Sequence, residues 1–238
     1  MATDQYETIA IDYEWYFDDV AQLLGSDTPG VRSIIGGLAP GALVLDAACG
    51  VGVDAAALAH RGFEVTAADA SPAMVAQARR RLDRVGSEDP IRVVTSAWTE
   101  LPTHLGNAVY DLVLCVGNSI AHADGSPAMI AAFKAFRSLL VPGGRLVLDT
   151  IDWERAHGEG SRIEIEPRVV ERRGSRCVRT YAWHVAPRFG DPWELEIAPI
   201  LLRDDRATLR SHRVVLHPFT RRQLRDRLAV AGFEAIAL

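Results

Sequence analysis

Between residues 42 and 149, short apolar segments alternate with amphipathic segments of helical periodicity, and this alternation limits the folds open to the chain. Continuous apolar runs are typical of parallel strands that are buried on both faces. Strands that alternate with helices favour an α/β fold with a doubly wound, mostly parallel sheet. The strands are expected at 42–47, 64–69, 91–95, 110–116 and 145–149, and the helices at 54–61, 71–85 and 127–140.

After residue 149 the pattern changes to one of paired strands joined by turn residues. A Gly174-Ser175 turn between two such strands is a hairpin signal, so we expect an antiparallel insertion at about residues 163–217. Thr220 is expected to cap a final helix. The later elements are expected as strands at 168–173, 176–185, 194–202 and 208–216, a helix at 221–231, and a last strand at 233–237.

The first 38 residues differ from the rest because aromatic side chains gather there. They predict an amphipathic helical segment over 4–24 and a short helix over 31–38, both outside the central sheet. We therefore divide the chain into an N-terminal helical lid, 1–38, and a main domain, 39–238.

Charge and cysteine content exclude several classes of partner. The net charge of −5 and a pI of about 5.8 give no support for nucleic-acid binding. Three widely spaced cysteines form no CxxC pair, which fits a reducing compartment. Because no signal peptide or apolar stretch of roughly 20 residues is apparent, we expect a cytoplasmic protein without a membrane partner.

The loop after the first strand carries the strongest chemical signal. Gly50 and Gly52 allow a tight turn close to a ligand, and Asp69, at the end of the second strand, can accept both hydroxyls of a ribose. A dinucleotide site would need a third glycine near Ala55, and the carboxylate of Asp46 would repel a phosphate. A nucleoside with a cationic tail, S-adenosylmethionine, suits this loop. The competing interpretation is an ordinary glycine-containing turn beside a helix-capping Asp69.

These motifs resemble those of class I S-adenosylmethionine-dependent methyltransferases. The shared segments are the glycine loop, Asp69-Ala70-Ser71 and the Pro142-Gly143-Gly144 turn. Further segments resemble the glycine/sarcosine N-methyltransferase branch over about residues 4–150: Asp4-Gln5-Tyr6 with Trp15, Ala48–Asp54, Ala97-Trp98 and Gly117–His122. The resemblance implies a Rossmann-like sheet of the seven-stranded type.

The resemblance also implies a set of residues that contact the cofactor. Asp69 would hold the ribose, Trp98 would border the adenine, and Tyr6 would come from the lid. Packing of an amphipathic helix remains the alternative for the lid aromatics, and a core anchor for Trp98. The whole set is Tyr6, Trp15, Ala48, Gly50, Asp69, Ala70, Ala97, Trp98 and Val116.

Two polar residues follow the fourth strand, where open α/β sheets bind their substrates. Asn118 can orient an acceptor molecule by accepting a hydrogen bond from its N–H or O–H group, and His122 can act as the catalytic base near neutral pH. The alternative for His122 is a loop histidine whose hydrogen bonds are made by backbone or water.

One departure from the glycine-methylating branch concerns the acceptor. Ile151 stands where those enzymes have an arginine that grips the carboxylate of glycine, so a substrate-binding role passes to Ile151 and Asp152. Asp149 and Asp152 could also ligate Mg²⁺, since carboxylate oxygens suit that ion. The alternative is that both are strand-end and turn residues.

We therefore expect a methyltransferase acting on a small polar molecule. O-methylation of a hydroxylated, sugar-like acceptor is narrowly favoured, because His122 or a metal could activate a hydroxyl. N-methylation of a small amine or amino acid is the alternative. A non-catalytic binder and a nucleotide-dependent reductase are the rivals from other classes, and a homo-oligomer is compatible with the sequence.

Overall fold

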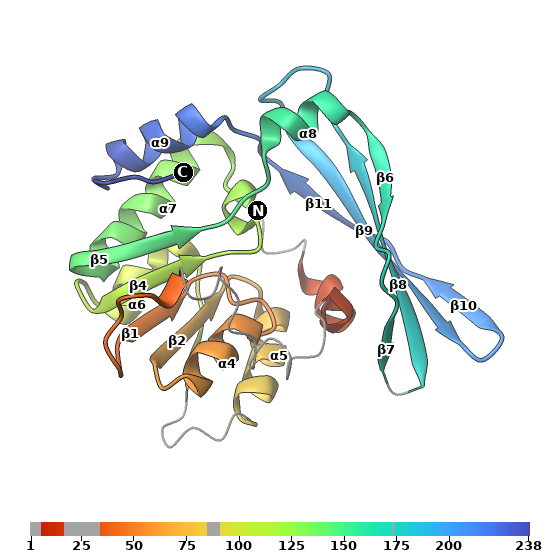
Figure 1. Ribbon diagram of the computed structural model, residues 1–238, viewed down its shortest axis with the longest axis horizontal. Helices are drawn as coiled ribbons and strands as arrows, with labels where there is room; N and C mark the ends of the chain where they lie inside the picture. Colours follow the sequence, from red (N-terminus) through yellow and green to blue (C-terminus); the bar gives the residue numbers. More distant parts are fainter. Residues whose placement is uncertain (1–5, 17–33, 85–90, 173) are drawn as a thin grey trace.

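A computed structural model describes residues 6–16, 34–84, 91–172 and 174–238. The described part of the chain has a parallel α/β layer and a separate antiparallel sheet, with the N-terminal segment between them (Figure 1). No α-helix in these ranges has both the length and the apolar character needed to cross a membrane.

The central sheet has the strand order β3-β2-β1-β4-β5, and all of its pairs are parallel. Because β1 lies in the middle of this order, the carboxyl ends of β1, β2 and β4 meet at one edge of the sheet. The strands are Leu43–Asp46 (β1), Glu64–Asp69 (β2), Arg92–Thr95 (β3), Tyr110–Cys115 (β4) and Leu140–Leu148 (β5).

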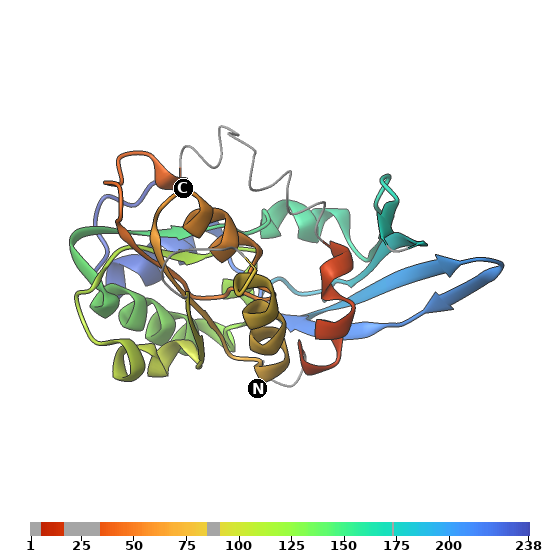
Figure 2. The ribbon, with the colours of Figure 1, turned by 90° about the horizontal axis from the view of Figure 1, so that it is seen from below.

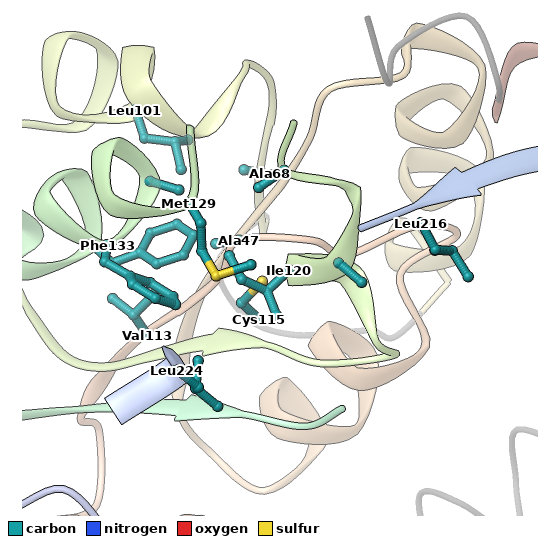
Figure 3. Close-up of a cluster of buried hydrophobic side chains, with 14 of the residues drawn as sticks. Ala47, Ala68, Leu101, Val113, Cys115, Ile120, Met129, Phe133, Leu216 and Leu224 are labelled. Carbon is teal, nitrogen blue, oxygen red and sulfur yellow. The ribbon is translucent and has the colours of Figure 1, made fainter. Parts of the chain in front are cut away.

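Alternate side chains of these buried strands pack against helices on opposite faces of the sheet. On one face Leu45 and Val113 contact a cluster that includes residues of α7 and α9, and Figure 3 shows its centre. On the other face Val44 and Leu112 pack against α4 and α5. The helices are Val53–His60 (α4), Pro72–Leu82 (α5), Leu101–Leu105 (α6), Gly125–Leu139 (α7), Trp153–Glu159 (α8) and Arg221–Val230 (α9), with 3₁₀ turns Trp98–Glu100 (η3) and Ser119–His122 (η4).

The second sheet is built on the long strands β8 and β9 and extends away from the parallel layer (Figures 1 and 2). One face of it is buried, since Trp183, Leu195 and Ile197 belong to the main core. Its strands are Arg162–Ile165 (β6), Val170–Arg172 (β7), Ser175–His184 (β8), Trp193–Arg203 (β9), Arg206–Leu209 (β10) and His212–Leu216 (β11).

Two short 3₁₀ turns, Ile9–Ile11 (η1) and Tyr13–Tyr16 (η2), join the two layers. The buried carboxylate of Asp12 accepts hydrogen bonds from Arg210, at 2.9 and 3.2 Å, and lies 3.2 Å from Nε2 of His212. A buried carboxylate needs such partners, so this cluster fixes the N-terminal segment against the antiparallel sheet.

The predicted parallel sheet, the antiparallel addition and two helix caps are confirmed. Ser71 accepts from the amide of Met74 with Pro72 at the first helical position, and Thr220 forms a capping box with Gln223. The predicted strand at 233–237 is wrong. Ala235 has a φ of 51°, which breaks an extended conformation, so the described sheet has five strands and not the seven-stranded arrangement.

Other boundaries also differ from the prediction. The single strand expected at 208–216 is two strands, β10 and β11, and the short helices α6 and α8 were not predicted. In the N-terminal region, residues 6 and 7 are helical, but Ile9–Ile11 and Tyr13–Tyr16 are 3₁₀ turns where a continuous α-helix was expected. Most of the remaining predicted helical residues lie outside the described ranges.

Gly52 tests how tightly the glycine loop packs. Its φ is +80°, and a Cβ there would lie 3.2 Å from both Cα and Cβ of Ala78, whereas Gly62 has a φ of +82° with no atom within 4 Å of such a Cβ. Gly62→Ala should cost roughly 1–2 kcal/mol from backbone strain alone. Gly52→Ala should cost about 1–3 kcal/mol more, because the helix must move. Urea unfolding of both variants measures the difference, and equal losses would show that α5 yields freely.

Candidate functional site

The carboxylate of Asp69 ties the glycine loop to the end of β2. One oxygen accepts a hydrogen bond from the amide of Gly50 and the other from the amide of Ser71, both at 2.9 Å. Burial raises the pKa of this carboxyl, and the two amides act in the opposite direction. Remaining lone pairs of the two oxygens can still accept ribose hydroxyls.

Asp46, at the end of β1, is a buried acid with an incomplete set of partners. Its Oδ1 lies 3.4 Å from the amide of Ala48, while Oδ2 is buried and has no hydrogen-bond donor among the described residues. Burial raises the pKa of Asp46 well above its ordinary value, and the neighbouring Asp54 raises it further. A cationic group at the loop would complete this site.

The N-terminal segment covers the same loop. A Cβ on Gly50 would lie 3.3 Å from Cε1 of Tyr13, so the tyrosine ring rests directly on the glycine. Glu7 accepts hydrogen bonds from the hydroxyl of Ser71 at 2.8 Å and the amide of Ala73 at 3.3 Å. The segment is therefore held at the start of α5 as well as on the second sheet.

Tyr6 and His122 form a hydrogen-bonded pair beside this loop. Nδ1 of His122 lies 3.2 Å from the carbonyl oxygen of Val215, which only accepts, so Nδ1 carries the proton. Nε2 is then an acceptor, and the hydroxyl of Tyr6 donates to it at 2.7 Å. Burial lowers the pKa of His122 to about 4 and raises that of Tyr6 well above its ordinary value. The pair is neutral at physiological pH.

Asn118 connects the ends of β4 and β5. Its side-chain oxygen accepts from the hydroxyl of Thr150 at 2.8 Å, and its backbone N–H donates to the carboxylate of Asp149 at 2.8 Å. The Thr150 hydroxyl accepts in turn from Nε1 of Trp153 at 2.9 Å. Because its carbonyl is occupied, Asn118 offers an acceptor molecule mainly its side-chain NH₂ group, whereas the sequence pointed to the oxygen.

The magnesium prediction for Asp149 and Asp152 has no support. Asp152 caps α8 by accepting from the amide of Arg155 at 3.1 Å, and its other oxygen lies 3.6 Å from Arg221. Within the described ranges, no group of three or more histidine, cysteine or acidic side chains is arranged to hold a metal ion. Asp152 is thus a turn residue, as the alternative interpretation had it.

The remaining predicted cofactor residues divide into two groups. Trp98 donates from Nε1 to the carbonyl of Ala47 at 2.8 Å, and its ring packs edge-on against Phe136, so it is anchored at the end of β1. Trp15 lies elsewhere, in a buried cluster with Val170 and Cys177 of the second sheet. Half-buried or exposed residues at the strand ends complete the cofactor set: Ala48, Ala70, Ala97 and Val116. Ile151, predicted to bind the substrate, is half-buried.

Sequence reasoning missed Glu7, Tyr13 and Thr150. Their position in the same aromatic and acidic segment as Tyr6 was the one signal in the sequence for Glu7 and Tyr13. Their contacts could not be predicted, because they depend on how that segment crosses the glycine loop. At the carboxyl end of the parallel sheet, these residues form a largely buried site that contains two carboxylates, two covering tyrosines and a neutral histidine.

The titration of His122 tests the tautomer and the burial of this pair. We expect its NMR resonances, identified by their loss in His122→Gln, to titrate near pH 4. Because the unfolded chain takes up this proton at a higher pH than the folded protein, the associated stability is complete above about pH 6.5 and is lost as the pH falls towards 4. A pKa at or above 6.5 would contradict the buried, neutral pair.

Comparisons with known proteins agree on the type of domain. A family model described as "Methyltransferase domain" matches residues 44–144. Rat glycine N-methyltransferase is 37% identical over 114 residues, which cover 44% of this chain and 39% of that enzyme. The chain thus spans less than half the length of this curated relative.

Solved structures extend the likeness over most of the chain. CalS10, an amino pentose methyltransferase from Micromonospora echinaspora, has a TM-score of 0.68 at 23% identity and covers 94% of this chain and 88% of its own. The sugar N-methyltransferase KedS8 from Streptoalloteichus sp. has a TM-score of 0.68 at 27% identity, covering 93% and 83%. Residues 44–144 therefore form a methyltransferase domain, in a chain with the fold of the class I S-adenosylmethionine-dependent methyltransferases.

Proposed function

We propose that the protein is an S-adenosylmethionine-dependent methyltransferase that methylates an amine of a small, sugar-like molecule. The observation that carries the cofactor assignment is the pair of carboxylates around the glycine loop. Asp69 is fixed by Gly50 and Ser71, and the buried Oδ2 of Asp46 has no donor in the described ranges. Such an arrangement suits a ribose and a cationic tail.

The side chains around the loop would have separate tasks. Asp69 would accept the ribose hydroxyls, the region of Asp46 and Ala48 would face the amino-acid end, and Ala97-Trp98 would border the base. Tyr13 and Tyr6 would exclude water from above. S-adenosylmethionine supplies an electrophilic methyl group on a sulfonium, so the protein has mainly to place the acceptor nitrogen in line with it.

The state of His122 favours an amine over a hydroxyl. With a pKa of about 4, and with Nε2 already bonded to Tyr6, His122 is too weak a base to keep a proton taken from an alcohol. A neutral amine attacks without such help and gives its proton to water afterwards. Since no metal-binding cluster occurs in the described ranges, a metal-activated hydroxyl also lacks support.

A free amino acid is a poorer candidate because no clamp for its carboxylate is apparent among the described residues. Ile151 is apolar, the guanidinium of Arg179 donates to the carbonyl of Tyr16, and Arg213 pairs with Glu194 and Glu196. Rat glycine N-methyltransferase is named for an amino acid, while CalS10 and KedS8 are named for sugars that carry amines. The two structural relatives align with more of this chain, which supports an aminosugar-like acceptor.

Hydroxyl methylation is the second candidate, and one observation favours it. The hydroxyl of Tyr6 is in direct contact with Nε2 of His122, so the pair could pass a proton from an acceptor hydroxyl if Tyr6 moved. The pH dependence of turnover separates the two candidates.

Release of labelled methyl groups should be followed for aminosugars, their hydroxyl counterparts and glycine. We expect the aminosugars to react and glycine to react poorly. With an amine, kcat/KM should rise with pH up to the pKa of the substrate ammonium, because only the neutral amine attacks. With a hydroxyl and His122 as base, the rate would instead rise through pH 4 and level off by about pH 6.

His122→Gln provides the second arm of this experiment. With an amine acceptor it should change kcat by less than roughly tenfold, whereas removal of a working general base costs about 10²–10⁴-fold. Turnover confined to hydroxyl acceptors and abolished in this variant would reject N-methylation. Binding of S-adenosylhomocysteine with no methyl transfer to any acceptor would leave only the cofactor assignment standing.

A further inference from the structure

Asn118 follows β4 in a backbone conformation that few side chains adopt. Its φ is 59° and the preceding Gly117 has a φ of 76°, so two consecutive left-handed residues turn the chain sharply after the strand. Asparagine tolerates this region better than most residues. The backbone N–H of Asn118 also donates to Oδ1 of Asp149, at 2.8 Å. The turn therefore holds the side chain of Asn118 at the carboxyl end of the sheet, beside the end of β5.

A chain of hydrogen bonds fixes which end of the Asn118 amide is the oxygen. It starts at Trp153, the first residue of α8 (Figure 1), whose Nε1–H can only donate and does so to Oγ1 of Thr150 at 2.9 Å. The hydrogen of that hydroxyl is left to donate to Oδ1 of Asn118 at 2.8 Å. The backbone N–H of Ile151 reaches the same oxygen at 3.4 Å. A reversed amide would set its NH₂ group against this N–H, so the NH₂ group lies on the other side.

The NH₂ group of Asn118 and one oxygen of Asp149 have no partners in the described ranges. No acceptor there bonds to Nδ2 of Asn118, and this atom is not one of the buried side-chain atoms that lack a partner, so a molecule can reach it. Asp149 is exposed, and its Oδ2 makes no hydrogen bond or ion pair with the same residues. A donor and an acceptor thus lie close together, and a hydroxyl group can satisfy both because it accepts and donates.

We propose that Trp153, acting through Thr150, fixes Asn118 as a hydrogen-bond donor and so selects an acceptor whose amine lies beside a hydroxyl group. The inference rests on the proposed transfer to an amine. A neutral amine has one lone pair, which it needs for attack on the methyl group, so the NH₂ group of Asn118 must bond to another atom of the acceptor. Because β4 neighbours β1, whose loop is assigned to the cofactor, that atom lies close to the amine. The hydroxyl of an amino alcohol fits, whereas Asp149 would repel a carboxylate.

The kinetic test compares two probes: the aminosugar that the wild type methylates fastest, and its deoxy analogue, in which hydrogen replaces the hydroxyls next to the amine. We expect the wild type to prefer the hydroxyl-bearing probe by at least about tenfold in kcat/KM, the value of one hydrogen bond. Thr150→Val removes the hydroxyl at nearly constant shape, so the amide can reverse. The preference should then fall below about threefold, mainly through a higher KM for the hydroxyl-bearing probe. Thr150→Ser keeps the hydroxyl and should restore the preference.

Thr66→Val is the matched control. Thr66 lies within β2, and its hydroxyl accepts a hydrogen bond from the hydroxyl of Tyr110 at 3.0 Å, so the change removes a comparable bond away from the strand ends. It should keep the wild-type preference. Equal use of both probes by the wild type, a preference that survives Thr150→Val, or a preference as low in Thr150→Ser as in Thr150→Val would overturn the inference. In each case the amine is still methylated, so the proposed function would stand.

An NMR measurement without acceptor tests the hydrogen-bond chain separately from the reaction. The indole N–H of Trp153 and the side-chain NH₂ of Asn118, identified by their loss in Trp153→Phe and Asn118→Asp, should both shift in Thr150→Val and stay in place in Thr66→Val. Resonances unchanged in Thr150→Val would overturn the inference even if aminosugars are methylated. Methyl transfer to hydroxyl oxygens alone would reject the proposed function and the selection of an amino alcohol, while the shifts would still establish Asn118 as a donor.

Discussion

The hydrogen bonds of Asp69 to Gly50 and Ser71 are the contact on which the candidate site depends. They join the loop after β1 to the start of α5, so one carboxylate sets the positions of both. Gly52 allows the loop to lie against Ala78, where a side chain would not fit without movement. The buried Asp46 can then face the same space, although its Oδ2 has no donor among the described residues. A folded protein tolerates a buried carboxylate oxygen without a donor where a bound ligand supplies the missing partner. We therefore infer that the cofactor binds at this edge of the sheet.

The N-terminal segment contacts both the parallel α/β layer and the antiparallel sheet, so both layers determine the geometry of the site. Glu7 bonds to the start of α5, Tyr13 covers Gly50, and Asp12 is held on the antiparallel sheet by Arg210 and His212. His122 reaches the same sheet through the carbonyl of Val215. Because these bonds cross from one sheet to the other, the antiparallel strands contribute to the geometry of the loop even though none of them carries the glycine motif.

Sequence patterns predicted the parallel sheet well because the information is local. Apolar runs, Ser71-Pro72 and Thr220 each act within a few residues, and their roles follow from strand burial and helix capping. The errors arose where distant contacts decide the outcome. Residues 233–237 look like a strand, but Ala235 adopts a positive φ and the segment remains irregular. Trp15 belongs to the same aromatic segment as Tyr6, yet it packs against Cys177 of the second sheet. The carbonyl of Asn118 appeared available for a substrate, whereas Thr150 occupies it, and the acidic side chain of Asp152 caps a helix that was not predicted.

Calorimetric titration of S-adenosylhomocysteine tests the central claim most directly, since it measures the cofactor site without requiring a known acceptor. Asp69→Asn should weaken binding by about 1.5–3 kcal/mol, roughly 10- to 150-fold, because a charged acceptor of hydrogen bonds is lost. Asp111→Asn is the matched control: Asp111 accepts a hydrogen bond from the amide of Leu43 at the opposite, amino-terminal edge of the sheet, and its replacement should leave binding unchanged. If Asp69→Asn binds S-adenosylhomocysteine as tightly as the wild type or more tightly, the assignment of this loop to S-adenosylmethionine is contradicted. An equal loss of affinity in both variants would contradict it as well.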